Sequence, residues 1–320
     1  ISSWLKLSKI QSMLIYETEI WPNFYKICGN KNIKLCVVNA RIQKNLHDKK
    51  FIKNIYIEAL GNCEFIMCKS DYEKEKYLKL GIKEKFLLSV GNLKYAYTSC
   101  EIKERDELND EQAEEIQEET LSYFLMASTH DPDEENFLQA IKELLDHGIG
   151  TVIAPRHINR SKRIAKFFED NGIKTYFLSK DKNILGQWKD IGILILDTFG
   201  DLPKFYRNSK YVYVGGGYSK RGVQNIIEPS IYGKPIIVGP NIDNFYEEIE
   251  NLKQLKGITI IEHDKSISVQ ENIAKNIRKF HGLNNEALIK KGKIAKTYSL
   301  KFKNVVENYI KILKDKKIIN

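Results

Sequence analysis

A glycine-rich stretch in the second half of the sequence has the residue types of a phosphate-binding loop. Three consecutive glycines, Gly215 to Gly217, follow a short apolar run, and Asn225 then precedes a helical pattern whose first turn contains Glu228. Glycine lets a ligand approach the backbone, and a helix N-terminus offers unpaired N–H groups and a partial positive charge. Neither the Walker spacing nor GxGxxG is present. The stretch therefore favours a phosphate site only slightly over an ordinary strand-to-helix turn.

Other candidate side chains come directly after predicted strands. In open α/β sheets, ligands bind outside the carboxyl ends of the strands, so we expect these residues to share one edge with the glycine loop. Arg156, presented by Pro155, could clamp a phosphate, or it could be a surface arginine paired with a carboxylate. The turn Thr198 to Asp201 could offer backbone groups to a base, although a helix cap explains it equally well. Glu228 could bind ribose hydroxyls, or it could simply favour the positive end of its helix.

Two carboxylates and one lysine follow strands predicted in the first half. Glu17 and Glu19 come directly after an apolar run, where one of them would tend to be desolvated. Lys94 follows another predicted strand and could stabilise negative charge that develops during a reaction. A structural ion pair between glutamate and lysine is an equally good explanation.

We expect no metal and no cofactor. Asp131 and Asp133 have a DxD spacing, but Pro132 between them indicates the start of a helix. The five cysteines are an odd number without a CxxC motif, which favours free thiols in a reducing cytoplasm.

Alternating strand and helix patterns predict an α/β fold in both halves. Short apolar runs between turn residues indicate strands, and amphipathic stretches with capping residues indicate helices. In the first half, strands are predicted at 13–16, 33–38, 64–67 and 86–90, and helices at 22–29, up to about 60 and at 71–80. In the second half, strands are predicted at 123–127, 151–154, 174–178, 193–196, 211–214, 236–238 and 259–261, and helices at 133–147, 161–171, 202–208, 226–232, 245–255 and 268–280. This alternation is typical of doubly wound parallel sheets.

The patterns divide the chain into two Rossmann-like domains. Residues 1–100 contain about four strands, fewer than the roughly six of a full domain, so we expect this domain to be incomplete at its N-terminus. Residues 101–120 are rich in Glu and Asp and predict a solvated linker helix, and residues 121–300 form the second domain. The last helix, 301–320, could cross back to the first domain through apolar residues at helical spacing: Phe302, Val305, Val306, Tyr309 and Leu313.

Composition excludes several classes of protein. The 320 residues carry a net charge of +9, but the lysines are scattered rather than packed in blocks, which argues against a nucleic-acid-binding module. The hydrophobic fraction of 42% is that of a soluble globular protein, and no run approaches the ~18 apolar residues of a membrane span.

Eight strings in order resemble one family. YETEIWPN, VVNARI, VGNLKY, ASTHDPDEE, APRH, DTFGDL, VGGGYSKRGVQNIIEPSIYGKPIIVGP and NF are similar to motifs of the 3-deoxy-D-manno-octulosonic acid (Kdo) transferases of lipopolysaccharide synthesis. Each string alone is weak, whereas their order is specific. The resemblance runs from about residue 12 to the mid-240s.

The resemblance implies a GT-B glycosyltransferase in which two Rossmann-like domains face a cleft. The second domain would bind CMP-Kdo and the first would bind the lipid A precursor, lipid IVA, at the cytoplasmic face of the inner membrane. The reaction would invert the anomeric centre without a metal. Glu17 and Lys94 match positions assigned to transition-state stabilisation, and the CMP contacts would be Pro155, Arg156, Phe199, Gly200, Asp201, Asn225, Ile226, Ile227 and Glu228.

The sequence also departs from the family pattern. Val223 and Gln224 stand where the family has glycine and histidine, and Asp201 replaces a glutamate. The family's membrane anchor and its SxGE segment, which carries the proposed general base, are not in this sequence. We therefore expect this chain to bind CMP or CMP-Kdo but to transfer Kdo poorly or not at all. The alternatives are another GT-B enzyme that uses a UDP-sugar, as a transferase or epimerase, and a non-catalytic remnant that still binds CMP.

Overall fold

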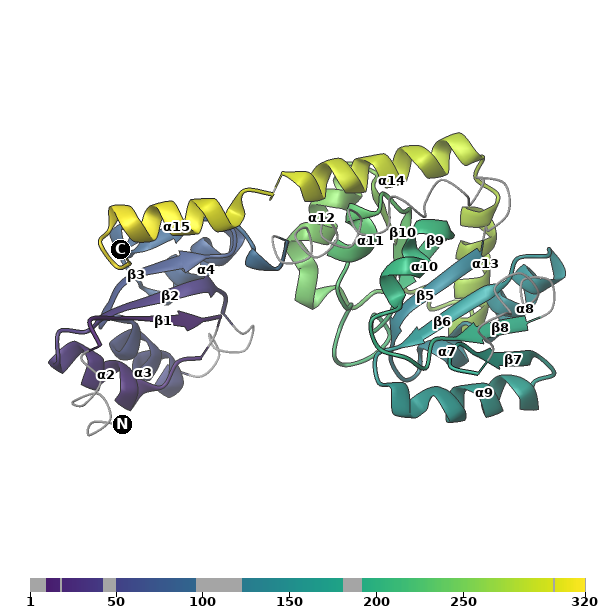
Figure 1. Ribbon diagram of the computed structural model, residues 1–320, viewed down its shortest axis with the longest axis horizontal. Coiled ribbons are helices and arrows are strands. Elements are labelled where there is room, and N and C mark those ends of the chain that lie inside the picture. Colours follow the sequence, from purple (N-terminus) through teal and green to yellow (C-terminus); the bar gives the residue numbers. More distant parts are fainter. Residues whose placement is uncertain are drawn as a thin grey trace. The chain divides into compact units, whose positions relative to one another are not determined.

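The structure is a computed structural model that describes residues 10–17, 19–42, 50–95, 123–180, 192–301 and 303–319. The chain forms two compact units (Figure 1). The first unit is Ile1–Cys100 together with Phe302–Asn320, and the second is Glu101–Lys301. The C-terminal segment thus belongs to the same unit as the N-terminal residues. The predicted linker at 101–120 lies outside the described residues.

The first unit contains a parallel sheet of four strands in the order β1-β2-β3-β4. The predicted strands are confirmed, with ends that differ by a few residues. The two central strands are buried almost throughout, because elements pack on both faces of the sheet. The strands are β1 (Ser12–Tyr16), β2 (Lys34–Ala40), β3 (Cys63–Cys68) and β4 (Leu87–Ser89).

Local signals in the sequence explain the helices that follow these strands. The helix α2 (Pro22–Asn30) has proline in its first turn, and α3 (Lys50–Leu60) precedes β3. In α4 (Asp71–Leu80), the Ser70 hydroxyl accepts a hydrogen bond from the Glu73 amide at the start, and Gly81 adopts φ +106° at the end. Side chains of these three helices form one hydrophobic core with the sheet.

The C-terminal helix α15 (Val305–Asp315) packs on a second hydrophobic cluster of the first unit (Figure 1). Val305, Tyr309 and Leu313 are buried there against side chains of β2 and β3. Val306 is exposed, and Phe302 lies outside the described residues. Three of the five predicted apolar positions therefore make the contact.

The second unit contains a seven-stranded parallel sheet in the order β11-β10-β9-β5-β6-β8-β7. The doubly wound fold predicted for this half is confirmed, and each predicted strand is present within two residues of its predicted ends. The strands are β5 (Tyr123–Thr129), β6 (Thr151–Pro155), β7 (Lys174–Phe177), β8 (Gly192–Ile195), β9 (Ser209–Val214), β10 (Ile236–Val238) and β11 (Ile258–Ile260).

The helices of the second unit differ from the prediction in two places. The helix predicted at 133–147 is two helices, α7 (Asp133–Asn136) and α8 (Leu138–Asp146), which meet at Phe137. The others are α9 (Ser161–Asp170), α10 (Leu202–Asn208), α11 (Ile227–Ile231), α12 (Tyr246–Gln254), α13 (Val269–His281) and α14 (Asn285–Leu300). The last of these, α14, is not among the predicted helices, because its buried face includes Gly292 rather than a continuous apolar stripe.

Close backbone contact fixes α14 on its unit. A Cβ atom added to Gly292 would lie 1.8 Å from the Gly233 carbonyl oxygen, so only glycine allows this approach. At the N-terminus of the helix, the Asn284 side chain accepts a hydrogen bond from the Ala287 amide. Within the described residues, no helix has the length and apolar character needed to cross a bilayer.

Candidate nucleotide site and charged pair

The loops predicted to share one edge of the second sheet do so. Because β9, β5, β6 and β8 are adjacent and parallel, the residues that follow them lie at the same carboxyl edge. The Gly215 amide donates to the Ala127 carbonyl, and the Arg156 amide donates to the Thr129 carbonyl at 3.1 Å. The glycine loop and the Arg156 turn therefore flank the end of β5.

The three glycines of the loop are required by packing. A Cβ atom on Gly215 would lie 2.5 Å from the Ser128 carbonyl oxygen, and one on Gly217 would lie 2.6 Å from the Gly239 Cα. Gly216 has φ +92°, a backbone conformation that other residues rarely adopt. The tight turn thus accounts for the glycines without a ligand, so the case for a nucleotide depends on the side chains around them.

Asp133 holds this loop in place, a role that the sequence did not indicate. Its buried carboxylate accepts hydrogen bonds from the Gly216 amide at 2.7 Å, the His130 amide at 2.8 Å and the Tyr213 hydroxyl at 2.8 Å. Burial raises the pKa of Asp133 to about 6, against the lowering effect of these three donors. The predicted start of a helix at this residue is confirmed.

Cationic and aromatic side chains lie at the same edge. The Arg156 side chain is exposed, and so is that of His157, whose ring centroid lies 5.6 Å from that of His130. Burial, with the charge of Arg221 next in importance, lowers the pKa of His130. This edge therefore offers a solvent-facing guanidinium with a second cationic side chain, Arg221, near the same histidine.

The turn after β8 combines an exposed aromatic ring with a tied carboxylate. Phe199 is 88% exposed, and Gly200 adopts φ +84°. Asp201 occupies the N-cap position of α10 without a capping hydrogen bond. Its carboxylate instead accepts a hydrogen bond from the Thr198 hydroxyl at 2.6 Å and pairs with Lys204 at 3.0 Å. The cap alternative for Asp201 is therefore wrong, and Phe199 is presented to solvent.

Asn225 and Glu228 form a local unit at the start of α11. The Asn225 side chain accepts a hydrogen bond from the Ile227 amide at 3.0 Å and donates to Glu228 at 3.2 Å. Glu228 is half-buried and also binds the Tyr206 hydroxyl, while Ile226 and Ile227 are fully buried. Since α11 has only five residues, its dipole is small, and side chains and loop amides must carry any affinity for phosphate.

The two residues at which the chain departs from the family pattern have structural partners. Val223 is fully buried, and its amide donates to the Asn241 carbonyl at 2.9 Å. The Gln224 side chain donates to the Gly222 carbonyl at 3.1 Å and hydrogen-bonds His130. Both residues therefore contribute to the conformation of this loop.

Glu17 and Lys94 form an ion pair in the first unit. Lys94 Nζ lies 2.9 Å from Glu17 Oε1, and Arg41 Nη2 lies 3.3 Å from Glu17 Oε2. The Glu17 side chain is 17% exposed and that of Lys94 is 47% exposed. Glu19 is separate from this group and accepts a hydrogen bond from the Trp21 ring nitrogen. The Glu–Lys ion pair that the sequence analysis gave as one explanation is thus present, and Arg41, which the sequence did not indicate, pairs with the same carboxylate.

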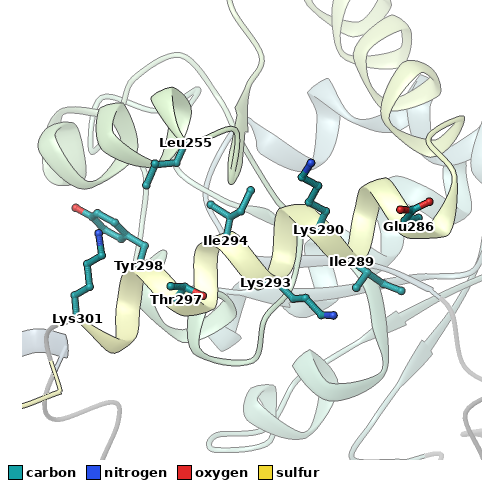
Figure 2. A pocket seen from close by; sticks show the side chains of 9 residues that line it. All are labelled: Leu255, Glu286, Ile289, Lys290, Lys293, Ile294, Thr297, Tyr298 and Lys301. Atoms are coloured by element: carbon teal, nitrogen blue, oxygen red, sulfur yellow. The ribbon is translucent and has the colours of Figure 1, made fainter.

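The hollow along α14 lies outside these sites. It has a volume of about 510 Å³ and contains none of the residues predicted to bind CMP (Figure 2). Among the described residues, no group of three or more His, Cys, Asp and Glu side chains is arranged to hold a metal ion.

Comparison with solved structures identifies the fold. A glycosyltransferase from Rickettsia africae matches with a TM-score of 0.60 and 16% identity, over 98% of this chain and 79% of that one. UDP-GlcNAc 2-epimerase from Neisseria meningitidis matches with a TM-score of 0.61 and 13% identity, over the same shares of the two chains. The fold is therefore that of the GT-B glycosyltransferases and epimerases, as predicted.

Sequence comparison gives similarity to one family of transferases. Residues 1–97 match the family described as 3-deoxy-D-manno-octulosonic-acid transferase (kdotransferase). The 3-deoxy-D-manno-octulosonic acid transferase of Rickettsia conorii is 27% identical over 94% of this chain and 59% of its own length, and that of Aquifex aeolicus is 28% identical over 78% and 60%. A bifunctional glycosyltransferase/methyltransferase of Fusobacterium nucleatum is 29% identical over 85% of this chain and 44% of its own length. The resemblance to the Kdo transferases is confirmed, and the chain spans about half of the length of these relatives.

Proposed function

We propose that this protein transfers Kdo from CMP-Kdo to a lipid A precursor such as lipid IVA. The observation that supports this most directly is the edge of the second sheet, where Arg156, Phe199 and the glycine loop before α11 follow the strands β6, β8 and β9. These residues match the CMP contacts implied by the family resemblance. The match of residues 1–97 to the 3-deoxy-D-manno-octulosonic-acid transferase family supports the same reaction.

The second unit would hold the nucleotide. The exposed guanidinium of Arg156 would bind the phosphate with two parallel hydrogen bonds, because its planar fork fits a phosphate group. Phe199 and Gly200 would contact the cytosine ring, and Glu228 would accept hydrogen bonds from the ribose. The Asn225–Glu228 contact and the Tyr206 hydroxyl keep the Glu228 carboxylate in one position.

The reaction would be an inverting displacement that needs no metal. A sugar hydroxyl of the lipid attacks the anomeric carbon of Kdo, a new C–O bond forms, and the bond to the phosphate breaks with its electron pair, so that CMP leaves. The hydroxyl proton passes to a base, which the family resemblance assigns to the SxGE segment. Arg156 stabilises the negative charge on the departing CMP, and the Glu17–Lys94 pair stabilises the transition state.

The acceptor would bind in the first unit, at the cytoplasmic surface of the inner membrane. A lipid acceptor has to be reached at a bilayer surface, and the net charge of +9 favours attraction to anionic headgroups. The partners proposed for this protein are therefore CMP-Kdo, the lipid A precursor and the membrane surface, without a nucleic acid.

Calorimetry with CMP and UDP tests the donor assignment on this chain. We expect CMP to bind and UDP to bind at least about tenfold more weakly, since the turn after β8 would be matched to cytosine. A preference for UDP would favour the alternative suggested by the fold shared with UDP-GlcNAc 2-epimerases. Binding of neither nucleotide would refute the proposed nucleotide site.

A further inference from the structure

The hydroxyl of Tyr309 lies at the carboxyl end of the first sheet. Tyr309 is on α15 and is only 3% exposed. Its Oη atom accepts a hydrogen bond from the Asn39 amide at 3.2 Å and donates one to the Gly91 carbonyl at 3.0 Å. Asn39 belongs to β2 and Gly91 follows β4. One hydroxyl thus joins the C-terminal helix to the ends of two strand segments.

Asn39 extends these contacts to two further residues. Its side-chain amide donates to the Tyr16 hydroxyl at 3.1 Å, and its Oδ1 atom accepts a hydrogen bond from the Leu93 amide at 3.0 Å. Asn39 is 1% exposed and adopts φ +51°, a left-handed conformation that asparagine tolerates better than most residues. Its side chain therefore bridges the end of β1 and the segment after β4.

Tyr16 and Leu93 are the residues immediately before Glu17 and Lys94. The two halves of the ion pair, 2.9 Å apart, are therefore attached to the two ends of the Asn39 bridge. The Glu17 amide is fixed independently by the Val38 carbonyl at 2.9 Å. Within the frame of the paired strands, the Asn39 side chain links the two backbone segments that carry the ion pair.

We propose that Tyr309 is a positioning residue that keeps Glu17 and Lys94 in register through Asn39. Removal of its hydroxyl would remove the hydrogen bonds of the buried Asn39 amide and the Gly91 carbonyl to Tyr309. Because unsatisfied buried polar groups are costly, we expect the backbone around Asn39 and Gly91 to shift. The inference rests on the proposed function for its catalytic meaning, since it assumes that the pair acts in Kdo transfer. The contacts themselves do not depend on that assumption.

The test measures the reactivity of the Lys94 amine in Tyr309→Phe. The Lys94 amine has to leave the Glu17 carboxylate, 2.9 Å away, before it can attack the reagent, so a loosened pair reacts faster. A short pulse of acetic anhydride followed by mass spectrometry gives the rate for the peptide that contains Lys94. We expect the rate to rise about two- to fivefold, the range for loss of a partly exposed ion pair. Tyr298→Phe, which removes a hydroxyl that binds Asn251 in the second unit, is the matched control and should leave the rate unchanged.

A double-mutant cycle with Glu17→Gln separates positioning from general loosening of the fold. In the E17Q background the pair is already absent, so Y309F should add nothing to the Lys94 rate. An unchanged rate in folded Y309F, or a full effect in the E17Q background, would overturn the proposal. If Y309F does not fold, Tyr16→Phe carries the test, because Tyr16 is 46% exposed and binds the other end of Asn39. An unchanged Lys94 rate in Y16F would overturn the proposal as well.

Measurement of CMP binding on the same samples keeps this inference apart from the proposed function. If the wild type binds no CMP but Y309F still raises the acylation rate of Lys94, the proposed function is refuted and the positioning role remains. If the wild type binds CMP but Y309F leaves the Lys94 rate unchanged, the positioning role alone is refuted.

Discussion

Asp133 Oδ2 accepts a hydrogen bond from the Gly216 amide at 2.7 Å, and this contact joins the start of α7 to the glycine loop. The same carboxylate also holds the His130 amide and the Tyr213 hydroxyl. Two loops of the proposed nucleotide site are thus fixed by one buried acid. Asp133 itself is 0% exposed, so it acts on a ligand only through these loops.

Replacement of Asp133 by asparagine should change how stability depends on pH. Burial raises the pKa of this carboxyl to about 6, above its ordinary value of 3.8, so the folded state favours the protonated form. The stabilisation that follows is complete below pH 4 and is lost as the pH rises through 6. We expect the free energy of unfolding of the wild type to fall by roughly 2–3 kcal/mol relative to D133N between pH 4 and pH 7.

Urea unfolding of both proteins across this pH range measures the difference. Subtraction of the two curves removes the contributions of other groups, including His130, whose lowered pKa has the opposite effect. Asp170→Asn, at an exposed acid paired with Lys166, is the control and should show no such slope. A pH-independent difference for D133N would mean that Asp133 is not perturbed in the folded state.

Much of the site follows from the sequence because strand ends are local features. Apolar runs bounded by turn residues give the ends of β6, β8 and β9, and a parallel sheet brings those ends to one edge. This reasoning correctly places Arg156, Phe199 and the glycine loop near one another. The arginine that follows β6 and the glycines that follow β9 then indicate that the ligand is an anion.

The residues that hold the site could not be read in this way. Asp133 binds an amide and a hydroxyl more than 75 positions away, at 83 and 80 residues along the chain, and no local pattern contains that pairing. No local pattern links Arg41 to Glu17 or Tyr309 to Asn39 either, so the sequence did not indicate these contacts around the Glu17–Lys94 pair. The helix α14 was missed because its buried face depends on Gly292, whose role is a close approach to Gly233.

Arg156→Ala should weaken CMP binding without weakening the fold. The side chain is exposed, so its loss removes contacts to the phosphate and little packing. Loss of charge-assisted hydrogen bonds worth about 1.5–3 kcal/mol would lower the affinity roughly 10- to 150-fold. Calorimetry with CMP measures this change, and thermal unfolding should be within about 2 °C of wild type.

Arg163→Ala is the matched control for this change. Arg163 is also an exposed arginine of the second unit, but it pairs with Asp131. Its loss should leave CMP affinity unaltered. Equal effects of R156A and R163A would show that only the general positive charge matters.

Glu17→Gln should separate a catalytic role from the structural ion pair. If the pair stabilises the transition state, transfer of Kdo by the native protein should fall about 10²- to 10³-fold, as for other preorganised charges. The stability change should be below about 1 kcal/mol, because the Lys94 partner is half-exposed. Radiolabelled transfer from CMP-Kdo to lipid IVA gives the rate.

Glu19→Gln is the control, since the Glu19 carboxylate accepts a hydrogen bond from the Trp21 ring nitrogen. It should retain full transfer. Undiminished transfer by E17Q, with a measurable loss of stability, would establish the pair as a structural element and remove it from the mechanism.

The loop residues that depart from the family pattern should respond differently to restoration of that pattern. Val223→Gly would leave a cavity at a fully buried side chain and add backbone freedom, at a cost of about 2–4 kcal/mol. Gln224→His removes only a side chain that binds Gly222 and His130, and it would restore the histidine of the family motif. We therefore expect Q224H to tighten CMP binding and V223G to lower the free energy of unfolding without a gain in affinity. Calorimetry and urea unfolding of the two single variants decide between these outcomes, and weaker CMP binding by a stably folded Q224H would count against the assignment of this loop to the nucleotide.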